Sequence, residues 1–476
     1  MSSVAEKEQY NYDIVKFCVI VGILMGVIGT AIGTWIASEL AFPILNFDIA
    51  EISFGRLRPV HTNTVIFGFG GFLLYGAGLY MVQHCTHARV RLEKLAWTAI
   101  ALWLIAMICV WVTLPLGITQ AKEYHEAEWW IDLMMAASWV CFTISFLATI
   151  AARKMSHIYV GLWFFISMLF MVTYIFVFNG LAIPVDMTFS YSAYSGIHDA
   201  MTQWWWGHNA VGFFLTAGFI GVMYYFVPKH ANRPIYSYRL SVLHFWSLTF
   251  LYVWVGAHHL HYTAIPDWTL SLGAGMSIAL IFPSWGGMIN GMMTMSGAWD
   301  KLRTDPVMRF MVVALAFYGM STFEGPLMGT KSVNALSHYT DWTVGHVHSG
   351  ALGWNAMIAI GAMYHMITRM WNTEMWSAKL VNMHFWVHLT GAVLYITAMW
   401  GSGVLQGLMW RAFDEYGNLV YTFADSVAAM HPFYALRATG GFLVFCGFCI
   451  MLYNTLKTIS AVKAGTNVTL TAEARA

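Results

Sequence analysis

The stretch Gly345-His-Val-His-Ser-Gly350 places two histidines two residues apart at the start of an apolar run that is long enough to cross a bilayer. Residues two apart on an α-helix project about 200° from each other, so His346 and His348 reach opposite sides of their helix. An ionisable side chain inside a membrane is costly and is therefore a functional candidate by default. One membrane helix thus offers an imidazole to each of its two flanks.

The composition of the rest of the chain also indicates a membrane protein. Of the 476 residues, 59% are apolar and only 10% are charged, which lies far outside the range of soluble domains. Twelve stretches are apolar and long enough to span a bilayer, the connections are short, and we see no internal repeat. We expect one all-α polytopic domain over residues 1–476. The expected helices cover approximately 14–38, 60–83, 95–116, 129–151, 157–180, 203–227, 239–262, 270–293, 307–329, 342–366, 379–405 and 434–457.

The loops between these helices differ in charge. Eighteen of the 24 Lys and Arg residues fall in the alternate segments that share a side with the N-terminus, and six fall on the other side. Because basic loops stay in the cytoplasm, we expect both termini to be cytoplasmic. The polar N-terminus lacks a small-residue cleavage site, so we expect the first apolar run to be retained as a helix. No histidine follows Cys446-Gly-Phe-Cys449, which argues against a covalently attached c-type haem.

Six of the 19 histidines share one depth in the predicted membrane domain. With the orientation taken from loop charge and the helical rise, all six fall within roughly 10 Å of the outer face. Unrelated packing histidines would scatter in depth. An adjacent pair on one helix and a third histidine on its neighbour also make a trigonal imidazole site, which suits copper or iron. The six residues are His61, His208, His258, His259, His346 and His348.

Three stretches resemble catalytic subunit I of the haem-copper oxidases. They are Trp204-Trp-Trp-Gly-His208-Asn, Tyr252-Val-Trp-Val-Gly-Ala-His258-His259 and Gly345-His-Val-His-Ser-Gly350. Within this superfamily the chain looks most like the cbb3-type cytochrome c oxidase, over essentially all twelve expected helices. The resemblance implies a fold of twelve transmembrane helices and these ligand sets: His61 and His348 for a low-spin haem b, His346 for a high-spin haem b3, and His208, His258 and His259 for copper B.

Two positions discriminate within the superfamily. Most haem-copper oxidases carry a catalytic tyrosine four residues after the first copper ligand, but position 212 here is glycine. Tyr252 lies seven residues before His259, which is two helical turns inward on the same face of the expected helix. The cbb3-type enzymes resemble this arrangement, with that tyrosine covalently joined to the first copper ligand, here His208. An ordinary membrane aromatic is the competing interpretation of Tyr252.

Two rival functions stay open at this point. Bacterial nitric oxide reductases share the six histidines, bind non-haem iron in place of copper, and typically carry a glutamate at the position of Gly212. A di-haem electron-carrying anchor or a transporter with histidine-lined helices is the non-enzymatic alternative, and it predicts no high-spin haem.

The resemblance assigns roles to further polar residues. Glu324 would be a hydrogen-bond partner of His346 that tunes the iron, although a helix-breaking site beside Pro326 is the alternative. Arg56, Arg58 and His338 suit haem propionates, and Glu123 would help to hold a calcium ion. A single proton channel would contain Ser241, His244, Tyr224 and Thr216, although hydroxyl groups can also bond harmlessly to their own helix.

The implied activity is the reduction of O2 to water by electrons from cytochrome c, coupled to proton transport in the respiratory chain. The implied location is the bacterial inner membrane, with the metal site near the periplasmic side. The implied partners are membrane-anchored mono-haem and di-haem cytochrome c subunits and a small single-helix subunit; nothing points to nucleic acid.

Overall fold

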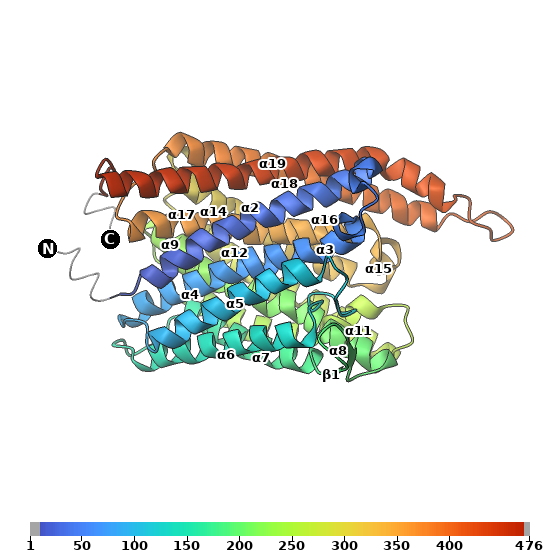
Figure 1. Cartoon of the computed structure of the whole chain (residues 1–476), viewed down its shortest axis with the longest axis horizontal. Helices are drawn as coiled ribbons and strands as arrows, with labels where there is room; N and C mark the ends of the chain where they lie inside the picture. The colour runs from blue at the N-terminus through green and yellow to red at the C-terminus, as the bar shows by residue number, and fades with distance from the viewer. Residues whose placement is uncertain (1–9, 471–476) are drawn as a thin grey trace.

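A computed structural model describes residues 10–470 as a bundle of long helices that run along one common axis (Figure 1). Large apolar side chains such as Leu133, Phe170 and Phe282 are exposed on its surface, as expected where helices face lipid. Helix α2 begins and helix α19 ends at the same end of the bundle. The uninterrupted long helices are α2 (Asp13–Ala41), α5 (Glu93–Thr113), α6 (Trp129–Ala151), α7 (Val160–Asn179), α14 (Pro306–Met328), α18 (Ala378–Trp410) and α19 (Phe423–Ala464).

Three other spans contain a π-helical segment between two α-helical parts. They are α3 (Phe54–Asn63), η3 (Thr64–Gly70) and α4 (Gly71–Thr86); α8 (Gly196–Asn209), η4 (Ala210–Ala217) and α9 (Gly218–Ala231); and α16 (Asp341–His348), η6 (Ser349–Ala356) and α17 (Met357–Met370). Each π segment begins within three residues of one of the six histidines, namely His61, His208 and His348. Such interruptions of an α-helix occur frequently at functional sites.

By length and composition, eleven helical spans among the described residues can cross a membrane. The continuous segment Asp341–Met370 is not one of these eleven, because its three histidines and Asn355 lower its hydropathy. It has the length of a span, 30 residues, and brings the number of spans in the described chain to twelve.

The histidine pair His258-His259 does not lie on an α-helix, contrary to the expected helix over 239–262. Helix α10 (Tyr238–Tyr252) ends at Tyr252, and both histidines lie in a 3-10 turn, η5 (Gly256–Leu260). The turn packs closely on α8, since a Cβ on Gly256 would lie 2.5 Å from the carbonyl oxygen of Trp204. Tyr252 and His259 therefore do not share a face of one α-helix, and the prediction that they do is wrong.

The remaining elements are short. One span is divided into α11 (Asp267–Ala279) and α12 (Ile281–Met293), and a small antiparallel hairpin, β1 (Ala182–Pro184) and β2 (Ser190–Ser192), precedes α8. The short helices are η1 (Pro43–Asn46), η2 (Ala50–Ile52), α13 (Lys301–Thr304) and α15 (Lys331–Ser337).

The chain also contains an internal repeat, which corrects the expectation that it has none. The Asn290 side chain hydrogen-bonds to both the N–H and the carbonyl of Ser237, the N-cap of α10 (both 2.9 Å). The Asn454 side chain does the same to Ser377, the N-cap of α18 (3.1 and 3.0 Å). The two N-caps lie 140 residues apart, as do His208 and His348.

Buried segments that lie 140 residues apart have similar sequences in the two repeats. Ile220-Gly-Val-Met-Tyr224 corresponds to Ile360-Gly-Ala-Met-Tyr364, and His244-Phe-Trp246 corresponds to His384-Phe-Trp386. The four-helix units that repeat are α7 to α12 and α14 to α19, each with a histidine followed by a π segment in its second span.

Candidate metal and haem centre

The nitrogen atoms of His208, His258 and His259 form one cluster. One ring nitrogen from each lies within 4.8 Å of the others, and no other such group of three or more potential ligands occurs between residues 10 and 470. His208 Nδ1 is 3.0 Å from His259 Nε2. The ring of Trp204 stacks on His259 at 4.2 Å between centroids and fixes its orientation. Three imidazoles converging on one point can hold a metal ion.

The protonation of His258 follows from its hydrogen bonds. The Ser277 hydroxyl donates to the carbonyl of Gly273 (2.6 Å), so its oxygen must accept the bond from His258 Nδ1 (2.6 Å). A hydroxyl has a single proton to give. His258 therefore carries its proton on Nδ1, and its Nε2 presents a lone pair, which is the form that binds a metal.

The ring of Tyr252 lies against His208, with 4.9 Å between centroids. The side chain is buried, and a Cβ on Gly212 would lie 2.3 Å from its ring carbons Cδ1 and Cε1. His208 Nε2 is buried and has no hydrogen-bond partner in the described chain. The absence of a side chain at position 212 thus brings Tyr252 to the ring of His208.

Glu324 binds three neighbours through its carboxylate. Its Oε2 lies 3.2 Å from His346 Nδ1 and also accepts a bond from the Ser349 hydroxyl (3.4 Å). Its Oε1 accepts a bond from the indole of Trp342 (2.8 Å). A carboxylate can only accept, so His346 donates from Nδ1 and leaves Nε2 for a metal. The residue is buried, and its place beside Pro326 does not end α14.

His61 and His348 have matching hydrogen bonds. His61 Nδ1 donates to the carbonyl of Gly29, and His348 Nδ1 donates to that of Val344, both at 2.8 Å. Both rings therefore keep Nε2 unprotonated, as a haem iron requires. A Cβ on Gly33 would lie 2.4 Å from His61, so this glycine makes room for the ring. The two histidines lie near each other.

Arg437 is a buried cation beside this pair that the sequence analysis did not single out. It interacts electrostatically with both His61 and His348, and its guanidinium lies over the ring of Tyr395 (5.5 Å), which itself stacks on His348. Its Nε is buried without a hydrogen-bond partner among residues 10–470, and its Nη1 lies 3.9 Å from Asp341 Oδ1. A buried arginine with an unused donor can bind an anionic group.

Known proteins resemble the chain over nearly its whole length. The family model described as cytochrome c and quinol oxidase polypeptide I matches residues 13–443. The cbb3-type cytochrome c oxidase subunit CcoN1 of Stutzerimonas stutzeri is 54% identical over 96% of this chain and 97% of that protein. The chain belongs to the cytochrome c oxidase subunit I family, in its cbb3-type branch.

Two further comparisons agree with this membership. A cytochrome c oxidase subunit 1 homolog of Bradyrhizobium diazoefficiens is 54% identical over 96% of this chain and 84% of that protein. A chain of a heme-copper terminal oxidase dimer shares the fold, with a TM-score of 0.74 and 14% identity over 93% of this chain and 84% of that one. The expected all-α membrane fold of haem-copper oxidase subunit I is confirmed.

Haem and copper are the cofactors that this family implies, and the donor set fits them. In this cbb3-type subunit the hydrogen bonds of four histidines fix a proton on Nδ1 and leave Nε2 free, which suits neutral axial ligation. The three converging imidazoles suit copper.

The residues expected to bind propionates and calcium have neighbours within the subunit. Arg58 forms an ion pair with Glu123 (2.6 Å), and Arg56 donates to the carbonyl of Pro115 (3.0 Å). His338 stacks on Tyr339 at 4.0 Å, and burial together with the nearby His261 lowers the pKa of His338, which keeps the ring neutral at pH 7.

The residues expected on the proton path lie in two places. The Tyr224 hydroxyl lies 2.9 Å from His244 Nδ1, and His244 Nε2 lies 3.2 Å from the hydroxyl of Tyr318, a residue that sequence reasoning missed among 23 tyrosines. Ser241 donates its hydroxyl to the carbonyl of Ser237 (3.0 Å) and lies near Tyr224. Thr216 lies near Tyr252.

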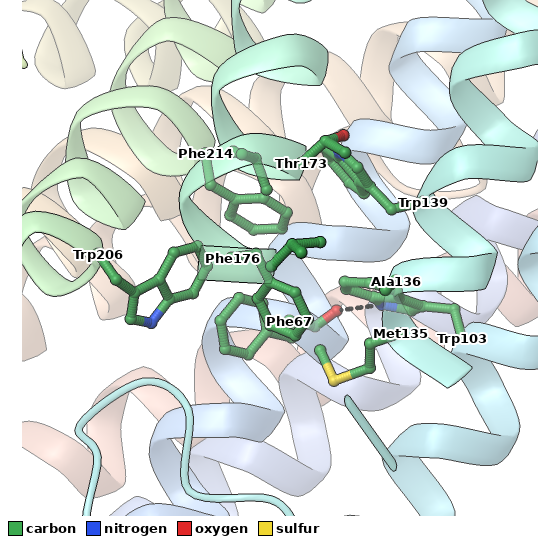
Figure 2. Close-up of a pocket in the computed structure, with 11 residues that line it drawn as sticks. Phe67, Trp103, Met135, Ala136, Trp139, Thr173, Phe176, Trp206 and Phe214 are labelled. Carbon is green, nitrogen blue, oxygen red and sulfur yellow. Dashed lines mark hydrogen bonds between the residues drawn. The ribbon is translucent and has the colours of Figure 1, made fainter. Parts of the chain in front are cut away.

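An apolar cavity lies beside the span that contains His208 (Figure 2). Trp206 and Phe214 from this span line it, opposite Trp103 and Trp139. The Trp103 indole donates to the carbonyl of Phe67 (2.8 Å), so its polar atom is satisfied and the wall stays apolar. The lining of the cavity suits an apolar molecule.

Proposed function

We propose that this subunit catalyses the reduction of O2 to water with electrons from cytochrome c. The oxygen-reducing centre comprises a high-spin haem b3 on His346 and copper B on His208, His258 and His259. His61 and His348 would hold a low-spin haem b, which would supply electron transfer to this centre. The observation that carries the proposal is the contact of Tyr252 with the copper ligand His208 at the place left open by Gly212.

The side chains around the centre have separable tasks. When bound, the haem iron and the copper supply O2 binding and electron transfer. Tyr252 lies within the centre and supplies a proton and an electron from its hydroxyl. Its proximity to the unpartnered Nε2 of His208 supports a covalent link between the two rings. Glu324 holds the proximal histidine through Nδ1 and increases its electron donation to the iron.

Proton delivery is proposed along Ser241, Tyr224 and His244, with Tyr318 as an additional member and Thr216 at the end beside Tyr252. The hydrogen bonds of Tyr224 and Tyr318 to the two nitrogens of His244 support a continuous exchange of protons between these helices. Both chain ends are proposed to lie in the cytoplasm of a bacterium, with the centre near the periplasmic side of the inner membrane.

Anionic haem propionates are proposed to bind Arg437, Arg58, Arg56 and His338. Arg437 has the strongest support, because it is buried and has an unused donor. Calcium bound through Glu123 remains a proposal that competes with the ion pair between Glu123 and Arg58. Mono-haem and di-haem cytochrome c subunits, with a small single-helix subunit, are the proposed partners.

The test is a reduced-minus-oxidised spectrum of the purified enzyme, recorded with and without carbon monoxide, together with metal analysis. We expect two b-type haems per subunit, of which one shifts on binding carbon monoxide, and one copper. Failure to see the shift would contradict an oxidase and favour an electron-carrying anchor. Iron in place of copper would indicate a nitric oxide reductase.

A further inference from the structure

The second repeat of the oxidase subunit contains its own histidine-tyrosine pair, which the proposed function does not use. The Tyr364 hydroxyl lies 2.9 Å from His384 Nδ1, as Tyr224 lies 2.9 Å from His244 Nδ1 in the first repeat. Tyr364 and His384 are both fully buried. The pair repeats, 140 residues later, an arrangement that serves proton transfer in the proposed function.

The two repeats differ in the residue that lies one helical turn after the histidine of each pair. In the first repeat, residue 248 is leucine and His244 Nε2 is bonded to Tyr318. In the second, the corresponding residue is His388, and both His384 Nε2 and His388 Nδ1 are buried without a hydrogen-bond partner among the described residues. The two rings lie 5.8 Å apart between centroids. Two unpartnered polar atoms in such a place require a functional explanation.

The hydrogen bond of His388 determines which of its nitrogens is free to take a proton. His388 Nε2 lies 3.3 Å from the carbonyl oxygen of Leu352. A carbonyl only accepts, so Nε2 carries the proton and Nδ1 presents a bare lone pair. A proton donated by Tyr364 to His384 Nδ1 would release one from His384 Nε2 toward this lone pair.

The surroundings of the pair are aromatic. Phe310 from α14 and Phe448 from α19 contact both rings, and Gly447 brings the backbone of α19 against His384. Within the described chain, the titratable neighbours of His384 are His388 and Tyr364, and that of His388 is His384. No acid or cation of the described chain contacts either ring. A charge gained here is therefore neutralised by no neighbouring side chain.

Leu352 connects the pair to a haem ligand. It lies in the π segment η6, four residues after His348. Protons can approach from the end of the bundle where α2 begins: Asp305 Oδ2 accepts a bond from His230 Nε2 (2.8 Å), and His230 Nδ1 lies 3.0 Å from His365 Nδ1. His365 directly follows Tyr364 on α17.

We propose that His384 and His388 together take up one proton when the haem held by His61 and His348 gains one electron. The iron changes from ferric to ferrous, one proton from the solvent is added to a neutral imidazole, and the net charge of the region is conserved. The physical reason is that an uncompensated charge in a low-dielectric interior is costly. This inference rests on the proposed low-spin haem.

The test is the pH dependence of the midpoint potential of the low-spin haem, measured by spectroelectrochemistry of the purified complex. Coupling of one proton to one electron lowers the potential by up to about 59 mV for each tenfold fall in proton concentration. We expect His388→Gln, which can still donate to the Leu352 carbonyl, to lose at least half of the wild-type slope. His388→Leu, the residue at the corresponding place in the first repeat, should have the same effect.

Phe448→Leu is the matched control, because it alters the packing against both rings without removing a titratable group. Its slope should equal that of the wild type. An unchanged slope in whichever histidine variant retains the haem, or an equal loss in Phe448→Leu, overturns the proposal. A wild-type enzyme without a low-spin haem spectrum would instead contradict the proposed function.

Discussion

The ring of Tyr252 stands where a side chain of residue 212 would otherwise be. A Cβ on Gly212 would lie 2.3 Å from two carbons of that ring, and the ring lies 4.9 Å from that of His208. His208 and Gly212 belong to one membrane span, whereas Tyr252 ends helix α10. The phenol therefore reaches His208 from a neighbouring span, and only a residue without a side chain at position 212 permits it.

Gly212→Ala should remove most of the oxygen consumption, because the new methyl group displaces the Tyr252 ring. Overpacking of a tight site costs about 1–3 kcal/mol, so we expect a loss of about tenfold or more in the rate per haem. An oxygen electrode measures it. Gly275→Ala is the control, since no atom lies within 4 Å of its Cβ position. Equal losses in both variants would contradict the steric explanation.

Tyr252→Phe keeps the ring and removes the hydroxyl. We expect oxygen consumption to fall by about 10²–10⁴-fold, the usual contribution of a positioned proton donor, with both haem spectra and the copper content unchanged. Tyr75→Phe, at a buried tyrosine that pairs with Ser138, should leave the rate near that of the wild type. Full activity in Tyr252→Phe would remove this residue from the mechanism.

The sequence predicts the number of spans and the six histidines because both depend on residue type and on distance along the chain. It does not predict that His258 and His259 lie in a 3-10 turn, because the hydropathy of a segment does not distinguish an α-helix from a 3-10 helix. The end of α10 depends instead on the tight contact between Gly256 and the backbone of Trp204, which is a tertiary effect.

The sequence does not predict the position of Arg437 for a related reason. The hydropathy pattern places the last helix at 434–457, whereas α19 begins at Phe423 with a capping box formed by Thr422 and Asp425. The first turns of α19 are less apolar than a typical span and pass unnoticed. Because α19 begins earlier than expected, Arg437 lies well inside the helix and not near its start, buried beside the histidine pair.

Glu324→Gln should weaken the bond between His346 and its iron. A neutral amide accepts the Nδ1 proton less strongly than a carboxylate, so the imidazole becomes a poorer electron donor. We expect a lower iron-histidine stretching frequency in the resonance Raman spectrum and a loss of about 10–100-fold in activity. Trp342→Phe removes another hydrogen bond of the same carboxylate and should affect both less. An unchanged stretching frequency in Glu324→Gln would show that the carboxylate does not tune the iron.

Ser277→Ala should lower the affinity of the cluster for copper. Without the hydroxyl, the Nδ1 proton of His258 has no acceptor, and its ring is no longer held in one orientation. Loss of such a partner costs about 10–100-fold in metal affinity. The affinity is measured by copper analysis after dialysis against a graded series of chelator concentrations. Ser284→Ala, at a buried serine on α12, is the control. Copper retention equal to that of the wild type would contradict the role assigned to Ser277.

Asp305 should make the stability of the subunit depend on pH. Its Oδ1 caps α14 by accepting from the amides of Val307 and Met308 (2.9 and 3.1 Å). Burial alone would raise the pKa of this carboxyl, but the hydrogen bond and charge of His230, with the capping amides, lower it below the ordinary value of 3.8. The unfolded chain therefore binds a proton more readily than the folded one. The stabilisation is fully present above about pH 4 and is lost as the pH falls through the folded pKa.

Thermal unfolding in detergent from pH 7 to pH 3 measures this dependence. Asparagine also caps helices well, so Asp305→Asn should retain the cap while losing the titration, and its stability should fall less than that of the wild type below pH 4. Asp305→Ala should lose about 1–2 kcal/mol at neutral pH through loss of the cap. Both side chains can cap the helix, but only the aspartate titrates. If stability fell with pH in the same way for the wild type and Asp305→Asn, another carboxyl would control acid unfolding.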